Sequence, residues 1–244
     1  MIDTQSAIDN AVERVIQDFR KYPGCYFTEE DVRWRLMKEI EDALATLNIN
    51  KHVKLKDGVT SLVHGEYPTP FRCAMGDRSF KLLPPESKGD RGHFDIVVLN
   101  PVAASEYEFK VIRLQDYQLF RRNLQAPSLP FLDCVIEIKL FRNLASNRAK
   151  STIQQADNAV QAVDKIAAAL EGQPEYYPKP FAKKGVVLLF DNSDLACAGD
   201  VELARNLFLE VFNKTTWTSV PTTLSCIWVT RQKRLDYPGQ KRLV

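Results

Sequence analysis

The sequence predicts a single α/β domain in which helices flank a central mixed sheet. The 244 residues are 45% hydrophobic and 26% charged, which is enough apolar material for one sizeable core. Helix-like and strand-like patterns alternate along the chain in the order α, β, β, β, α, β, α, β. No stretch resembles an inter-domain linker, so we expect residues 1–244 to form one domain.

Two helices are predicted at the start of the chain. Over residues 5–21 apolar side chains recur at spacings of three and four. A second helix is expected over 28–47, because Thr28 can cap it and the acids that follow suit the helix dipole. At about 100° per residue, Glu29 falls in the middle of the apolar face of this helix, whereas Glu30 does not.

The middle of the chain is predicted to hold strands, a loop and an insert. Residues 60–74 have an extended pattern, and their two prolines indicate a bent or edge strand. Residues 76–92 are polar, contain two prolines and are predicted to be a loop. The β-branched run over 93–100 predicts a strand. An insert over about 101–130 follows, most of which is expected to be helical.

The second half of the chain alternates regularly between strands and helices. The expected elements are a strand over 132–141, a helix over 149–171, a strand over 184–190, a helix over 200–213 and a strand over 224–230. The strand over 184–190 shows no alternation of apolar and polar residues, so we expect both of its faces to be buried. The core is expected over about 28–190, followed by a helix–strand extension over about 195–244.

Several classes of protein are disfavoured by composition. The five cysteines are scattered and odd in number, and no Cys-x-x-Cys or Cys/His cluster occurs, so neither a zinc site nor a disulfide framework is indicated. Isolated thiols and an N-terminus unlike a signal peptide predict a cytoplasmic protein. The longest apolar runs are about five residues, far short of the roughly 18 that a membrane span needs, so no membrane partner is expected.

The residues that best indicate chemistry lie in the strands over 93–100 and 132–141. Glu137 and Lys139 are two apart and therefore share one face of an otherwise apolar strand, where charges are expensive to bury. Asp95 has a comparable place in the preceding strand. If the two strands are neighbours, these three side chains can converge. Two carboxylates beside a lysine suit Mg²⁺, or Mn²⁺, held together with a substrate phosphate.

In these features the chain resembles the PD-(D/E)xK nuclease superfamily, which has the restriction-endonuclease-like fold. Proteins of that superfamily have an α-β-β-β-α-β core, with an Asp on the second core strand and a (D/E)-x-K triplet on the third. Asp95, Glu137 and Lys139 match this pattern, and the resemblance covers roughly residues 28–190. The chain departs from the pattern at Phe94, which stands where the motif has a proline.

The resemblance implies a metal-dependent nuclease that acts on DNA. Asp95 and Glu137, joined by Glu29 from the first core helix, would hold the Mg²⁺. The metal would polarise the phosphate and supply a hydroxide, while Lys139 positions the attacking water. Glu66, in the bent strand, is a weaker candidate for an additional carboxylate.

The distribution of charge favours a polyanionic partner, although the net charge is only +2. Residues 1–50 carry ten acids and six bases, whereas residues 121–150 carry six bases and two acids. The tail over 231–244 carries five bases and one acid. Basic stretches thus lie close to the proposed site and suit a phosphate backbone. The predicted nucleic-acid contacts directly after the Glu-x-Lys strand are Arg142, Arg148 and Lys150.

Other interpretations stay open. Glu137 and Lys139 can instead form an exposed cross-strand pair of a half-solvated sheet. A fold does not determine a function, so the chain can be a catalytically inert module that binds nucleic acid or protein. A small-molecule enzyme can use the loop over 191–194, which follows a buried strand, although a plain turn is the simpler interpretation. The insert over 101–130 can be a homodimer surface or a lid over substrate.

Overall fold

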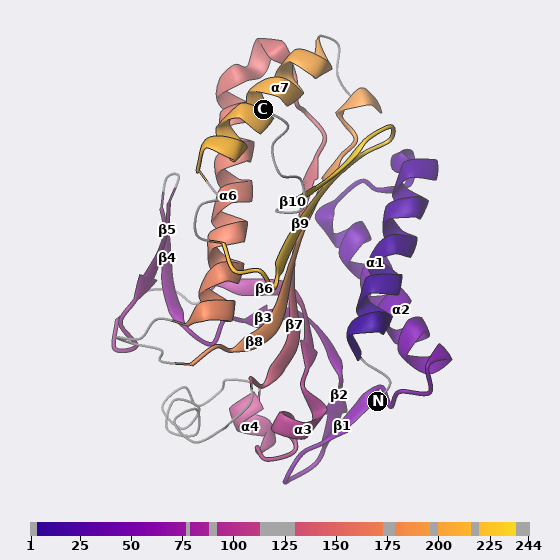
Figure 1. Cartoon of the computed structure of the whole chain (residues 1–244), viewed down its shortest axis with the longest axis vertical. Helices are drawn as coiled ribbons and strands as arrows, with labels where there is room; N and C mark the ends of the chain where they lie inside the picture. Colours follow the sequence, from indigo (N-terminus) through magenta and orange to yellow (C-terminus); the bar gives the residue numbers. More distant parts are fainter. Residues whose placement is uncertain are drawn as a thin grey trace.

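A computed structural model describes residues 4–76, 79–87, 92–112, 130–172, 179–195, 200–215 and 220–237. These residues form one α/β domain in which a six-stranded mixed sheet lies between two layers of helices (Figure 1). The predicted fold class is therefore confirmed. Within the described part of the chain, no helix is long and apolar enough to cross a membrane.

Four long helices build the outer layers. Their bounds are α1 Thr4–Lys21, α2 Glu29–Thr46, α6 Ala149–Glu171 and α7 Val201–Thr215. A complete capping box fixes the start of α2, because the Thr28 hydroxyl accepts from the Asp31 N–H while the Asp31 carboxylate accepts from the Thr28 N–H. The shorter helical turns among the described residues are η1 Pro23–Cys25, α3 Pro101–Ala104, α4 Phe109–Ile112, η2 Ser146–Arg148 and η3 Ser193–Leu195.

The main sheet has the strand order β10-β9-β8-β7-β6-β3. Its strands are β3 Val63–Pro68, β6 His93–Leu99, β7 Leu132–Phe141, β8 Ala182–Asp191, β9 Leu224–Thr230 and β10 Arg234–Tyr237. The pairs β3/β6, β6/β7 and β9/β10 are antiparallel, and β7, β8 and β9 run parallel. Helix α6 makes the crossover between β7 and β8, so α2, β3, β6, β7, α6 and β8 follow the predicted α-β-β-β-α-β order.

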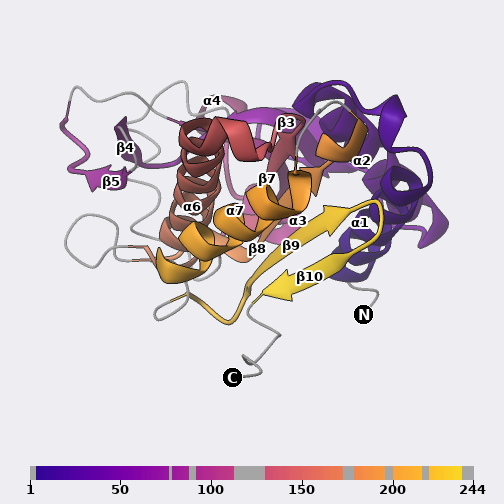
Figure 2. The same ribbon diagram turned by 90° about the horizontal axis from the view of Figure 1, so that it is seen from above.

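The two helical layers cover opposite faces of this sheet (Figure 2). On one face Phe19 of α1 packs on Phe190 of β8, with ring centroids 4.8 Å apart. On the other face Phe141 of β7 packs on Phe208 of α7 at 4.9 Å. Helix α6 approaches β8 so closely that a Cβ atom at Gly185 would collide with the side chain of Ile166. This close approach holds α6, and the side chains it carries, directly over the centre of the sheet.

Two strand pairs lie outside the main sheet: β1 His52–Lys54 with β2 Val59–Ser61, and β4 Arg72–Gly76 with β5 Ser79–Leu83. The extended region predicted over 60–74 is therefore divided among three strands. The prediction of a loop over 76–92 was wrong at β5, because strand pairing with β4 and the packing of Phe80 against Phe71 outweigh the polar composition.

The remaining elements were predicted closely, with β1 and β10 as additional short strands. Of the insert expected over 101–130, α3 and α4 are helical as predicted, and residues 113–129 lie outside the described residues. Because those residues are not described, a homodimer formed through the insert stays a prediction. The cytoplasmic location also stays a prediction.

Candidate active site

The candidate site forms where β6 separates from β7. The two strands pair as far as Ile96 and Ile136, whereas β6 continues beyond this point with β3. Past Ile136, two backbone N–H groups of β7 are bound by side chains instead of a strand. The Ile138 N–H donates to Oδ2 of Asp95 at 2.6 Å, and the Leu140 N–H donates to Oε1 of Glu29 at 3.3 Å. The opened edge of β7 thus recruits one carboxylate from β6 and one from the start of α2.

Glu137 lies beside this edge and is almost completely buried, with 2% of its surface exposed. Oε1 of Glu137 makes an ion pair with Nζ of Lys165 from α6 at 2.6 Å. Burial is the main cause that raises the pKa of Glu137 to about 7, and the nearby Asp95 carboxylate adds to the rise, while Lys165 and Lys139 oppose it. Glu137 and Asp95 are therefore close enough to repel each other.

Lys139 reaches the same cluster from β7. Its Nζ atom lies 3.5 Å from Oε2 of Glu29. Burial acts to lower the pKa of Lys139, but the carboxylates of Glu137, Glu29 and Asp95 together outweigh burial and raise it. Lys139 is therefore a cation at neutral pH, which suits the stabilisation of negative charge.

A guanidinium from α2 completes the cluster. Arg33 makes ion pairs with Glu30 and Glu66, and its Nη1 atom lies 3.6 Å from Oδ1 of Asp95. Glu66 lies between the two residues of β3 that pair with Ile96 and Phe94, and its carboxylate and that of Asp95 both approach Nη1 of Arg33. Glu66, predicted as a weaker candidate for an additional carboxylate of the metal site, thus lies near the site but makes an ion pair with Arg33.

The number of acidic side chains that lie close together limits which cation the site can hold. Among the described residues, no three His, Cys, Asp or Glu side chains cluster closely enough to hold a metal ion. Asp95 and Glu137 remain as a pair of hard oxygen donors, and Mg²⁺ is commonly held by only one or two protein carboxylates. A divalent cation between these two carboxylates would offset the negative charge that Asp95 adds to the surroundings of Glu137, whose pKa is raised mainly by burial. Glu29, predicted as a third ligand, contacts Lys139 and the Leu140 N–H.

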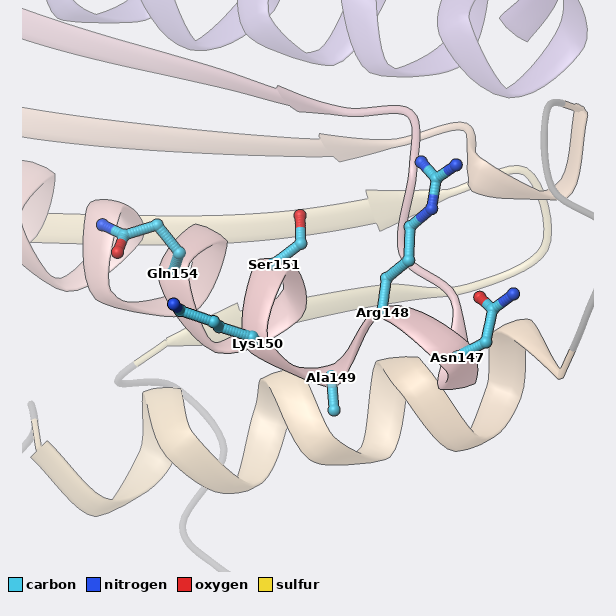
Figure 3. A pocket seen from close by; sticks show the side chains of 6 residues that line it. All are labelled: Asn147, Arg148, Ala149, Lys150, Ser151 and Gln154. Atoms are coloured by element: carbon cyan, nitrogen blue, oxygen red, sulfur yellow. The ribbon is translucent and has the colours of Figure 1, made fainter.

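The predicted nucleic-acid contacts divide into two places. Arg148 and Lys150 line an open pocket of about 690 Å³ at the start of α6, and their side chains extend from the first turn in different directions (Figure 3). The first turn of α6 has no acidic residue, and the N-cap side chain makes no capping hydrogen bond. Positive charge and the helix dipole therefore act together here. Arg142 instead donates to the Phe27 carbonyl, next to the start of α2.

The loop over 191–194 is a structural turn. The buried Asp191 carboxylate accepts from the Ser193 N–H at 2.9 Å and from Nε of Arg205 at 2.6 Å. Arg205 also lies 2.9 Å from Asp194. The acids of this loop thus hold α7 against the end of β8, which agrees with the simpler of the two interpretations and gives the small-molecule reading no support.

Two basic residues of the site were missed in the sequence. Lys165 lies on the side of α6 opposite the apolar stripe formed by Ala156 and Val160, where that stripe predicts no burial. No motif or spacing in the sequence singles out Arg33. A signal for Lys165 was present, since Ile166, Ala168 and Ala169 surround it with apolar residues on sides of the helix away from that stripe.

Comparison of the chain with protein-family models, with curated proteins and with solved structures found no match. Function must therefore be inferred from the residues of the site and from their geometry.

Proposed function

We propose that this protein is a metal-dependent nuclease that hydrolyses phosphodiester bonds, with DNA as its substrate. One observation carries the proposal: the opened edge of β7 gathers two repelling carboxylates, Asp95 and Glu137, beside the cationic Lys139. The resemblance of Asp95 and Glu137-Ile138-Lys139 to the PD-(D/E)xK pattern supports the same conclusion.

Each residue has a distinct part in the proposed reaction. Asp95 and Glu137 would hold the divalent ion, and the Ile138 N–H keeps the Asp95 carboxylate oriented toward β7. When bound, such an ion supplies Lewis acidity toward a phosphate oxygen and lowers the pKa of a water molecule. Lys139 stabilises the charge that develops on the phosphate and orients the attacking water. Glu29 holds the Lys139 side chain near the opened edge.

The substrate backbone is expected to run past the start of α6. Arg148 and Lys150 are exposed there, and free backbone N–H groups of a first helical turn attract phosphate. These residues follow β7 in the chain, so the cationic pocket and the Glu-x-Lys strand belong to one continuous segment.

A cleavage assay tests the proposal. Labelled DNA is incubated with the full-length chain in Mg²⁺, Mn²⁺ or EDTA. We expect cleavage that requires the metal and that falls at least about 100-fold in Glu137→Gln and in Lys139→Met. Lys183→Met removes an exposed lysine that pairs with Asp133, and it serves as the matched control that keeps wild-type activity. Equal rates in all four proteins would contradict the assignment.

A catalytically inert binding module is the second candidate, and one observation favours it. Each of the three central carboxylates already faces a basic side chain without a metal. The pairs are Glu137 with Lys165, Asp95 with Arg33, and Glu29 with Lys139. Calorimetry separates the candidates: a nuclease requires a Mg²⁺ or Mn²⁺ site that depends on Asp95 and Glu137, whereas the inert module has none.

A further inference from the structure

The buried lysine of the site has an unusually fixed position. Lys165 is 5% exposed, and its Nζ atom lies 2.6 Å from Oε1 of Glu137 and 2.7 Å from the His93 carbonyl. The same ammonium lies 5.8 Å from the ring centroid of Phe94. Contacts with β6, β7 and the aromatic ring therefore hold the charge in one place, while burial leaves it little room to turn away.

Lys139 differs from Lys165 in this respect. Its side chain is 24% exposed, and its partner Glu29 is itself 45% exposed, so this ion pair can rearrange when a substrate arrives. Lys165 has no comparable freedom because its partner Glu137 is as buried as it is. The two lysines of the cluster thus have different properties, one adaptable and one fixed.

The fixed ammonium takes up one oxygen of Glu137. In two-metal nucleases the ions lie about 3.5–4 Å apart and share ligands. A second ion bridged by Glu137 would have to lie within about 2.1 Å of a carboxylate oxygen, next to the position that Nζ of Lys165 occupies. Two neighbouring cations on one carboxylate oxygen repel strongly in a buried environment.

We propose that Lys165 is a built-in cation that takes the place of a second metal, so that the site binds a single divalent ion. This inference rests on the proposed function, because it assumes that Asp95 and Glu137 hold an ion. Lys165 is a positioning residue in this account: it acts through Glu137 and does not touch the substrate.

Counting Mn²⁺ ions tests the inference. The full-length chain is titrated with Mn²⁺ alone, and bound ions are counted by calorimetry and by the paramagnetic resonance signal of free Mn²⁺. We expect one ion per wild-type chain and none in Glu137→Gln. Two coupled ions in the wild type would overturn the inference and leave the nuclease proposal intact. No bound ion in the wild type would overturn the proposed function itself.

A variant of the lysine gives a second, independent readout. Lys165→Gln removes the repulsive charge, so we expect Mn²⁺ to bind at least about 10-fold more tightly, or a second ion to appear. A merely structural lysine would give unchanged or weaker binding on substitution, and that result would overturn the inference. Lys165→Arg keeps the charge and should keep one ion, as should the control Lys183→Gln. The wild-type count remains decisive if Lys165→Gln fails to fold.

Discussion

Nζ of Lys165 and Oε1 of Glu137 lie 2.6 Å apart in a pair that is almost entirely buried between α6 and β7. Both charges lose their hydration on folding, and each is tolerated because the other is present. The pair therefore joins the helix to the strand that carries the Glu-x-Lys triplet, and it couples the stability of the domain to the candidate site.

The first prediction concerns this pair. Lys165→Met leaves Glu137 buried without its partner, and we expect the free energy of unfolding to fall by about 3–5 kcal/mol at pH 8. In the Glu137→Gln background the same substitution should cost far less, because no unpaired charge remains. Urea unfolding of the four proteins measures the difference. An equal cost in both backgrounds would show that the two side chains are not coupled.

The second prediction concerns the start of α2. The Phe27 N–H, followed by the N–H and hydroxyl of Thr28, lowers the pKa of the Asp31 carboxyl below its usual range. A carboxyl with a depressed pKa in the folded state stabilises the protein above its unfolded pKa, and this contribution disappears as the pH falls through the folded pKa. The stability lost in Asp31→Asn should therefore be present at pH 7 and shrink toward pH 3.

Urea unfolding at several pH values measures this effect. Asp42→Asn, at the other end of the same helix and outside the capping box, is the charge-matched control. A stability difference between wild type and Asp31→Asn that is the same at pH 7 and pH 3 would contradict the capping account.

The third prediction concerns the start of α6. If Arg148 and Lys150 contact phosphates, each substitution to Ala should weaken DNA binding in EDTA. Each should also reduce the slope of log K against log salt concentration by about 1, because one fewer counterion is released. Fluorescence anisotropy over a range of salt concentrations gives both values. Lys214→Ala, an exposed lysine of α7, should leave the slope unchanged, and an equal effect of all three would indicate a general effect of net charge.

Much of the site could be predicted because strands have a simple period. Alternation places Glu137 and Lys139 on one face, and convergence with Asp95 was expected only if the two strands were neighbours, a condition that the pairing of β6 with β7 meets. The fold class followed from the order of the elements. Neither the alternation of residues in a strand nor the order of the elements shows that β6 separates from β7 at Ile96. This separation leaves the Ile138 N–H free to bind Asp95.

The basic half of the cluster could not be predicted in the same way. Helix α6 is buried on several sides, against β7 and β8 as well as α7, so a search for one apolar stripe misses Lys165. Arg33 is placed by the position of α2 relative to β3 and β6, which is a tertiary relationship. Strand pairing with β4 likewise explains why β5 forms within the polar segment that was predicted to be a loop. Each omission arises from packing between distant elements.

Anomalous diffraction from a crystal soaked in Mn²⁺ tests the central claim most directly. We predict one anomalous peak, within about 2.2 Å of a carboxylate oxygen of both Asp95 and Glu137, with Lys165 still paired to Glu137. The peak should vanish in Glu137→Gln. A soaked crystal with no peak between Asp95 and Glu137 would contradict the claim that the opened edge of β7 is a metal-dependent active site.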